Sequence, residues 1–340
     1  GPFFTNKIFG TRYNRKFVKP VRIGRMRKMK HLLTMNDLSN DEIMELLSDA
    51  ELFAKGEAWQ PKRKHFISNL FFEPSTRTKS SFEMAERKLG LEIIPFEVST
   101  SSVLKGETLY DTVKTLESIG VDSVVIRHSE DNYFAKLIQD GVYLSIINAG
   151  DGCGHHPTQC LLDLLTIKQE FGQFKGLKVA IAGDIRHSRV ARSNAETLRR
   201  LGAEVVFSGP ENWATLKGSG IAFEPVDTAV KTADVFMLLR IQHERHSVEM
   251  PLTKEEYLKQ YGLTFERESQ MKQNCIIMHP APVNRGVEIE DALVECERSR
   301  IFKQMENGVF ARMAALKNSI EHKEGAGLNE TMYTKCKIVG

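Results

Sequence analysis

Residues 71–85, FFEPSTRTKSSFEMA, decide how the first half of the chain is organised. An apolar run ends at Pro74, and a pattern with the apolar spacing of an amphipathic helix follows it. Between the two lie three hydroxyl side chains and one guanidinium group, those of Ser75, Thr76, Arg77 and Thr78. Because a helix N-terminus has unpaired N–H groups and a partial positive charge, these side chains predict a phosphate-binding turn between a strand and a helix. The alternative interpretation is an ordinary Ser-Thr helix cap beside a surface arginine.

The same alternation of strand and helix patterns continues along the chain. Repeated strand–helix–strand units predict parallel sheets covered by helices, and nearly continuous apolar runs predict strands buried on both faces. The predicted strands are 66–71, 92–98, 122–127, 143–148, 178–182, 204–207, 234–239 and 275–278. The longest helical patterns are 40–55, 76–89, 106–119, 157–171, 189–201 and 302–322. We therefore predict an α/β protein with two doubly wound parallel-sheet domains linked by helices.

The expected domain boundaries follow from these patterns. A basic leader covers 1–30, a first domain covers 31–157, and a second domain covers 158–307. A C-terminal helix at 308–324 returns to complete the first domain, and 325–340 forms a loose tail. The helix that starts near His156 bridges the two domains.

Composition limits the classes of function. The 340 residues are 41% hydrophobic and 27% charged, which suits about two globular domains. The formal charge of +3 hides ten basic and no acidic residues in 1–30, so the remainder carries −7. The leader lacks both a nucleic-acid-binding pattern and the apolar core of a secretory signal, and no apolar run reaches membrane-spanning length. We expect neither a nucleic-acid partner nor membrane insertion.

The five cysteines are few and widely spaced, so they predict no disulfide framework and favour a reducing compartment. We expect a cytoplasmic protein. The alternative is an organelle of the plastid type, if the Arg-rich leader is the remnant of a transit segment.

Loops that follow the predicted strands carry most of the candidate chemistry. In open parallel sheets, ligands bind beyond the carboxyl ends of the strands. Arg, Lys, His and hydroxyl side chains are frequent there and acidic residues are scarce, which predicts one or two anionic ligands. These loops are 73–78, 99–106, 127–128, 150–159, 183–189, 240–245 and 279–282.

Two further patterns in these loops do not predict a cofactor. The spacing of Cys153, His155, His156 and Cys160 fits no standard metal-ligand set. The glycine-containing loops GDGCGHH and AGDIRHSR lack the G-x-G-x-x-G dinucleotide pattern. We expect no metal and no other cofactor.

Six ordered blocks resemble the catalytic chains of the aspartate carbamoyltransferase family, over about residues 31 to 316. They are FFEPSTRTKSSFEMA, KGETLYDT, VIRH, HPTQCLLDLLTI, LLRIQHER and HPAPVNRGVEI. Ornithine enzymes of the wider family should carry an H-C-L-P loop and a D-x-x-x-S-M-G segment. This chain has His279-Pro280-Ala281-Pro282 and no S-M-G, which favours aspartate as the second substrate.

The resemblance implies a reaction. Carbamoyl phosphate and L-aspartate would give N-carbamoyl-L-aspartate and phosphate, a step of pyrimidine biosynthesis. An amine attacks the acyl phosphate directly, so catalysis needs no enzyme nucleophile and consists of positioning two anions and stabilising an oxyanion. The alternatives are another transcarbamylase, such as an ornithine enzyme, and a non-catalytic anion-binding relative.

The resemblance also implies roles for residues at the carbamoyl phosphate end. The segment Ser75, Thr76, Arg77 and Thr78 would hold the phosphate, and Arg127 would bridge phosphate and carbonyl oxygen. A neutral His156 would donate to that oxygen with Thr78 and Arg127. Gln159 and the backbone at Pro280 and Ala281 would contact the carbamoyl amide. The alternatives are a helix cap for His156 and a strand-end salt bridge for Arg127.

At the aspartate end, the implied residues are Arg189, Arg240, Gln242 and Ala281. Arg186 and Arg192 compete with Arg189 for this role, and the alternative for Arg189 is a surface ion pair.

The loop with Ser101 and Lys105 would reach the active site of a neighbouring subunit, where both residues contact phosphate and Lys105 also contacts aspartate. Ser99 and Ser102 compete with Ser101. The implied assembly is a homotrimer with shared sites, and the sequence identifies no regulatory subunit.

Overall fold

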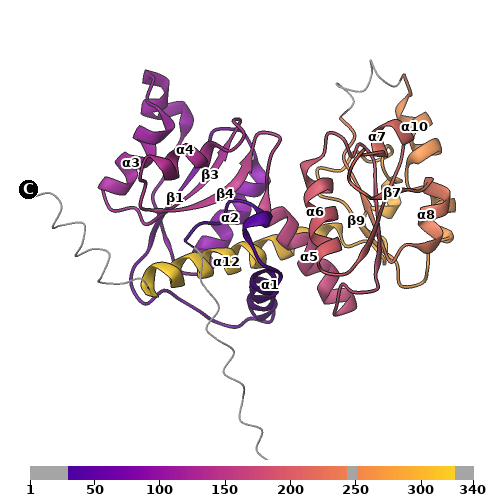
Figure 1. The fold of residues 1–340 in the computed structure, drawn as a ribbon, viewed down its shortest axis with the longest axis horizontal. Helices are drawn as coiled ribbons and strands as arrows, with labels where there is room; N and C mark the ends of the chain where they lie inside the picture. The colour runs from indigo at the N-terminus through magenta and orange to yellow at the C-terminus, as the bar shows by residue number, and fades with distance from the viewer. Residues whose placement is uncertain (1–29, 243–250, 326–340) are drawn as a thin grey trace, which may run out of the picture.

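The computed structural model describes residues 30–242 and 251–325 (Figure 1). Nearly all of the predicted leader and tail therefore lies outside the described residues. The strands are β1 (Phe66–Phe71), β2 (Glu92–Ile93), β3 (Ser123–His128), β4 (Ser145–Asp151), β5 (Lys178–Ala182), β6 (Glu204–Ser208), β7 (Ala222–Phe223), β8 (Val235–Leu238) and β9 (Ile276–Met278). The α-helices are α1 (Asn40–Ala54), α2 (Thr76–Lys88), α3 (Leu109–Ser118), α4 (Tyr133–Gln139), α5 (Pro157–Phe171), α6 (Arg189–Arg200), α7 (Glu211–Ala214), α8 (Val226–Thr232), α10 (Lys254–Tyr261), α11 (Phe265–Ser269) and α12 (Ile301–Gly325). Short 3-10 turns occupy Met35–Asp37, Val98–Thr100, Ser102–Lys105 and Asp291–Leu293.

The strands form two parallel sheets, as predicted, and each sheet with its helices makes up one unit. The first sheet has the order β2-β1-β3-β4 and the second has the order β7-β6-β5-β8-β9. All eight predicted strands are present, but β2 stops at Ile93 instead of reaching residue 98. Pro95 lies just beyond it and has no N–H for the ladder. The two-residue edge strand β7 was not predicted, because so short a segment has no periodicity.

Helices cover both faces of each sheet. Neighbouring residues on a strand point to opposite faces, so Val124 and Val125 of β3 belong to different apolar clusters. One face of the first sheet packs against α1, α2, α5 and α12, and the other packs against α3 and α4. The cluster on the first of these faces continues through α5 to α6 and the second sheet. A single core thereby connects the two sheets. No helix within the described ranges is long and apolar enough to cross a membrane.

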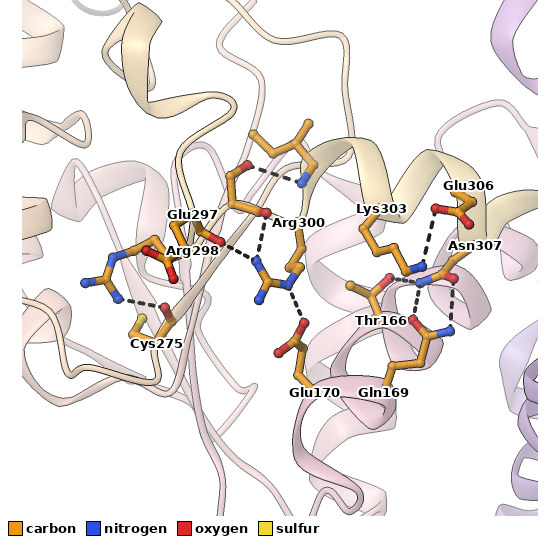
Figure 2. Close-up of polar contacts among 12 residues, drawn as sticks. Thr166, Gln169, Glu170, Cys275, Glu297, Arg298, Arg300, Lys303, Glu306 and Asn307 are labelled. Atoms are coloured by element: carbon orange, nitrogen blue, oxygen red, sulfur yellow. Dashed lines mark hydrogen bonds and ion pairs between the residues drawn. The ribbon is translucent and has the colours of Figure 1, made fainter. Parts of the chain in front are cut away.

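The helices α5 and α12 are joined by polar contacts as well (Figure 2). Asn307 of α12 donates to Thr166 Oγ1 over 2.9 Å and to Gln169 Oε1 over 2.8 Å. Gln169 Nε2 donates back to Asn307 Oδ1, and Arg300 pairs with Glu170. Beyond these contacts, α12 runs along α1 and α2 of the first unit (Figure 1). The contacts with α12 therefore attach the bridge helix α5 firmly to the first unit.

A buried carboxyl group lies between α2 and β1. Glu86 is fully buried, and its Oε1 accepts a 2.7 Å hydrogen bond from Asn69 Nδ2. Burial raises the pKa of Glu86 from its ordinary 4.5 to about 8, although the bond from Asn69 acts in the opposite direction. Glu86 is therefore protonated in the folded protein at neutral pH and ionised in the unfolded chain.

This difference predicts a pH-dependent stability. Between pH 4.5 and 8 folding takes up a proton at Glu86, so its contribution to stability falls as pH rises. Glu86→Gln cannot ionise. Relative to the wild type, its free energy of unfolding should therefore rise with pH over this range, by up to about 1.4 kcal/mol per pH unit. Denaturant unfolding from pH 5 to 8 measures the difference. The exposed substitution Glu92→Gln is the control, and a parallel pH dependence in both variants would contradict the assignment.

Candidate active site

A cavity of about 490 Å³ lies between the two units, at the carboxyl ends of their strands. Its walls come from loops that are distant in sequence and that were predicted from the strand ends. The predicted residues that line it are Ser75, Arg77, Thr78, Arg127, His156, Gln159, Arg189, Arg240, Gln242, Pro280 and Ala281.

The turn before α2 leaves its polar groups available. Ser75 is the N-cap residue of α2, but its side chain makes no capping hydrogen bond. The simple helix-cap interpretation therefore does not describe Ser75. Arg77 and Thr78 also line the cavity, whereas Thr76 is exposed and lies outside the lining. The first turn of the helix thus presents backbone N–H groups, hydroxyls and a guanidinium group to one region of the cavity.

Two arginines from different units converge above Gly150. A Cβ atom on Gly150 would lie 3.1 Å from Arg127 Nη1 and 3.3 Å from Arg189 Nη2. Arg127 Nη1 donates to Ala149 O over 3.2 Å, and Arg189 donates to Gly152 O. The alternative for Arg127 was a salt bridge at the end of its strand. The acidic group near it is Glu73, whose Oε2 lies 3.8 Å from Arg127 Nε. Burial lowers the pKa of Arg127 and the charge of Arg189 lowers it further, so this pair repels and favours an anion between them.

His156 lies beside these cations. It is the N-cap residue of α5, and its side chain makes no capping bond. Burial lowers the pKa of His156 well below its ordinary value, and the charges of three arginines lower it further. These are Arg312, Arg189 and Arg127. The direction of this shift favours the predicted neutral imidazole, and its buried Nδ1 has no hydrogen-bond partner among the described residues.

The sequence did not single out Arg312, which also lines the cavity. Its Nη1 donates to Ser81 Oγ over 3.0 Å, and its guanidinium carbon lies 5.0 Å from the centroid of the Phe82 ring. Gly308, one helical turn earlier, leaves space for the Arg312 guanidinium group, because a Cβ atom at Gly308 would lie 2.5 Å from Arg312 Nη1. Burial lowers the pKa of Arg312 to about 10, so it stays charged at neutral pH. A glycine four residues before an arginine on the buried face of a helix is the only sequence signal.

The second unit supplies the other end of the cavity. Arg240 and Gln242 follow β8, and Arg189 begins α6. Neither competitor of Arg189 lines the cavity; Arg192 donates instead to Arg186 O over 2.7 Å. Asp184 and His187, joined over 2.8 Å, also line this end and were not predicted as site residues.

Two family models match consecutive parts of the chain. The carbamoyl phosphate-binding domain of aspartate/ornithine carbamoyltransferases matches residues 30–169, and the aspartate/ornithine-binding domain matches 175–318. The chain belongs to the aspartate/ornithine carbamoyltransferase family. It is therefore a carbamoyltransferase, and the loops that line the cavity fall within both matched regions.

Solved structures of aspartate transcarbamoylases are similar over most of their length. The catalytic subunit from M. jannaschii is 34% identical, with a TM-score of 0.77 over 87% of this chain and 100% of that chain. The Trypanosoma cruzi enzyme in complex with N-(phosphonacetyl)-L-aspartic acid is 30% identical, with a TM-score of 0.74 over 85% and 95%. The same enzyme in complex with carbamoyl phosphate and aspartate is also 30% identical, with a TM-score of 0.73 over 85% and 96%.

The 98–106 loop does not line the cavity of its own carbamoyltransferase chain. Ser101 Oγ donates to Val98 O over 3.0 Å and accepts from Val103 N over 3.3 Å. Leu104 is 68% exposed and Lys105 is also exposed. The predicted contacts of Ser101 and Lys105 with substrate therefore do not occur within one chain. Within 30–242 and 251–325, no group of three His, Cys, Asp or Glu side chains is arranged to hold a metal ion.

Gly150→Ala tests whether the convergence of Arg127 and Arg189 matters. The added Cβ would displace both guanidinium groups, and we expect kcat/KM to fall on the order of a hundredfold. Gly141→Ala is the matched control, because Gly141 also has a positive φ, 84° against 132°, but nothing lies within 4 Å of its Cβ position. Equal activity losses in the two variants, with folding checked by circular dichroism, would show that backbone strain alone is responsible.

Proposed function

We propose that this carbamoyltransferase transfers the carbamoyl group of carbamoyl phosphate to L-aspartate. The observation that carries the proposal is the distribution of cations at both ends of one cavity. Arg77 and Arg127 come from the first unit, and Arg189 and Arg240 come from the second. Carbamoyl phosphate and a dicarboxylate amino acid both suit such surroundings, whereas the terminal ammonium of ornithine would face arginines. The Trypanosoma cruzi relative binds carbamoyl phosphate and aspartate, which supports the same assignment.

The proposed chemistry follows from these positions. The α-amine of aspartate attacks the carbonyl carbon, forming a C–N bond and a tetrahedral oxyanion. Thr78, Arg127 and neutral His156 donate to this oxygen, and donors fixed in place before reaction stabilise the transition state. The bond between carbon and the phosphate oxygen then breaks. The amine proton passes to the departing phosphate oxygen, and hydrogen phosphate leaves toward Ser75, Arg77 and the N-terminus of α2.

Arg77→Ala tests the phosphate end. Purified wild-type protein should form carbamoyl aspartate from carbamoyl phosphate and aspartate, and should not form citrulline from ornithine. The variant should lose at least about a hundredfold in kcat, because it lacks a charge-assisted donor in the transition state. Lys79→Ala, two residues later on α2, is the control. Near-normal turnover by Arg77→Ala would refute the assignment.

Arg240→Ala tests the aspartate end. Because Arg240 belongs to the second unit, the variant should raise the KM for aspartate on the order of tenfold or more and leave that for carbamoyl phosphate little changed. Steady-state kinetics with each substrate varied in turn measures both values. An equal rise in the KM values for aspartate and carbamoyl phosphate would contradict the assignment of Arg240 to the aspartate end of the cavity.

We further propose a cyclic homotrimer in which Ser101 and Lys105 complete the cavity of a neighbouring chain. Support comes from the family resemblance and from the loop itself, which is exposed and contributes nothing to its own cavity. A heterologous interface of this kind forms a closed ring when the rotation between neighbouring chains is one third of a turn.

Mixed trimers test this sharing. Arg77→Ala and Lys105→Ala should each be nearly inactive, yet a trimer with both kinds of chain regains one intact site of three. Co-expression with two tags gives such trimers, and specific activity measures the recovery. Activity that stays at the single-variant background, in trimers whose composition mass spectrometry has verified, would mean that Lys105 serves its own chain.

The product suggests a place in pyrimidine biosynthesis, since carbamoyl aspartate contains the atoms of the pyrimidine ring. We propose the cytoplasm as the compartment, with the plastid-type organelle as the alternative. Unpaired cysteines at positions 153, 160, 275 and 296 support a reducing environment.

A further inference from the structure

A buried carboxylate lies behind the cavity wall and is not part of the proposed chemistry. Asp163 of α5 is 1% exposed and accepts three hydrogen bonds from side-chain amides. Its Oδ1 accepts from Gln304 Nε2 over 2.8 Å and from Gln159 Nε2 over 3.3 Å. Its Oδ2 accepts from Asn194 Nδ2 over 2.8 Å. Asp163 therefore connects three helices, α5, α6 and α12.

The directions of these bonds follow from the chemistry of the groups. The backbone N–H of His279 can only donate, and it donates to Gln304 Oε1 over 2.9 Å. The NH₂ group of Gln304 must then face Asp163, so Asp163 Oδ1 acts as an acceptor. Burial raises the pKa of Asp163 to about 6, against the three hydrogen bonds that lower it, so the group is ionised at neutral pH.

An acceptor at this position also determines the orientation of Gln159. Gln159 lies one helical turn before Asp163 and lines the cavity. Its NH₂ group faces Asp163, and its carbonyl oxygen is left for the cavity. If the acceptor were absent, the Gln159 amide could turn and present NH₂ there instead.

We propose that Asp163 is a positioning residue that makes the enzyme select a carbamoyl group over an acetyl group, by fixing the Gln159 oxygen as an acceptor. This inference rests on the proposed function, together with the contact between Gln159 and the carbamoyl amide that the family resemblance implies. The NH₂ group of carbamoyl phosphate donates a hydrogen bond to that oxygen. The methyl group of acetyl phosphate, which has nearly the same shape, cannot donate and would leave the buried acceptor unpaired.

The measurement is the Ki of acetyl phosphate, as a competitor of carbamoyl phosphate, divided by the KM of carbamoyl phosphate. Asp163→Ala should lower this ratio about tenfold, the scale of one hydrogen bond. Asp163→Asn should keep it within about twofold, because the introduced amide still offers an oxygen to Gln159. Its new NH₂ group can donate to the buried Asn194 Oδ1, which has no partner among the described residues and can rotate to accept.

The matched control is Asn194→Ala, which removes a donor from the opposite oxygen of the same carboxylate. It should lose stability comparably, as measured by thermal unfolding, but retain the ratio. If Asp163→Ala does not fold, the double variant Asp163→Leu/Asn194→Leu fills the volume of the removed carboxylate and leaves one buried donor fewer, that of Asn194, without a partner. This double variant should show the same fall in selectivity.

The possible outcomes distinguish a failure of the proposed function from a failure of the role proposed for Asp163. A wild-type protein that forms no carbamoyl aspartate would contradict the proposed function. A wild-type protein that turns over but has a ratio near one would contradict the selectivity alone. An unchanged ratio in Asp163→Ala, or an equal fall in Asn194→Ala, would overturn the role of Asp163.

Discussion

The proximity of Arg127 and Arg189 is the constraint on which this site depends. Two guanidinium groups above one glycine repel each other, and the carboxylate of Glu73 comes only within 3.8 Å of Arg127. Because the Arg127 side chain is largely buried, this repulsion favours binding of an anion that contacts both arginines. Burial lowers the pKa of His156, and the charges of Arg312, Arg189 and Arg127 lower it further. This favours the neutral imidazole, which can donate to an oxyanion without carrying charge. Binding and catalysis thereby rest on one electrostatic arrangement.

The fold keeps these charges together through α5 and α12. Arg127 and Arg189 belong to different units; the first sheet packs on α5, and α5 packs on α6 of the second unit. Buried contacts such as Asn307 with Thr166 then attach α12 to that helix (Figure 2). Since Arg312 lies on α12, this third arginine near His156 is positioned by a helix that is attached to the bridge helix α5. Buried polar groups of this kind cost stability unless every one is paired, and they fix the geometry when they are.

Much of the site was predictable, because its residues lie directly after strands. Arg240, for example, follows an apolar run, and parallel strands bring such positions to one edge. The choice of Arg189 over its neighbours was not predictable from spacing, because it depends on where Ser188 caps α6. Arg312 was missed because its hydrogen-bond partner is 231 residues away along the chain. The contribution of Lys105 depends on a second chain, so the structure of one chain does not test it.

If the proposed function is right, one cavity holds a phosphate group and two carboxylates at the same time. Titration calorimetry with N-(phosphonacetyl)-L-aspartate, which combines a phosphonate with two carboxylates, measures this directly. We expect one molecule bound per chain, at least about a hundredfold more tightly than phosphate or L-aspartate alone, because the phosphate end and the aspartate end of the cavity are occupied together. Binding no tighter than that of phosphate, or equal binding of the corresponding ornithine compound, would contradict it.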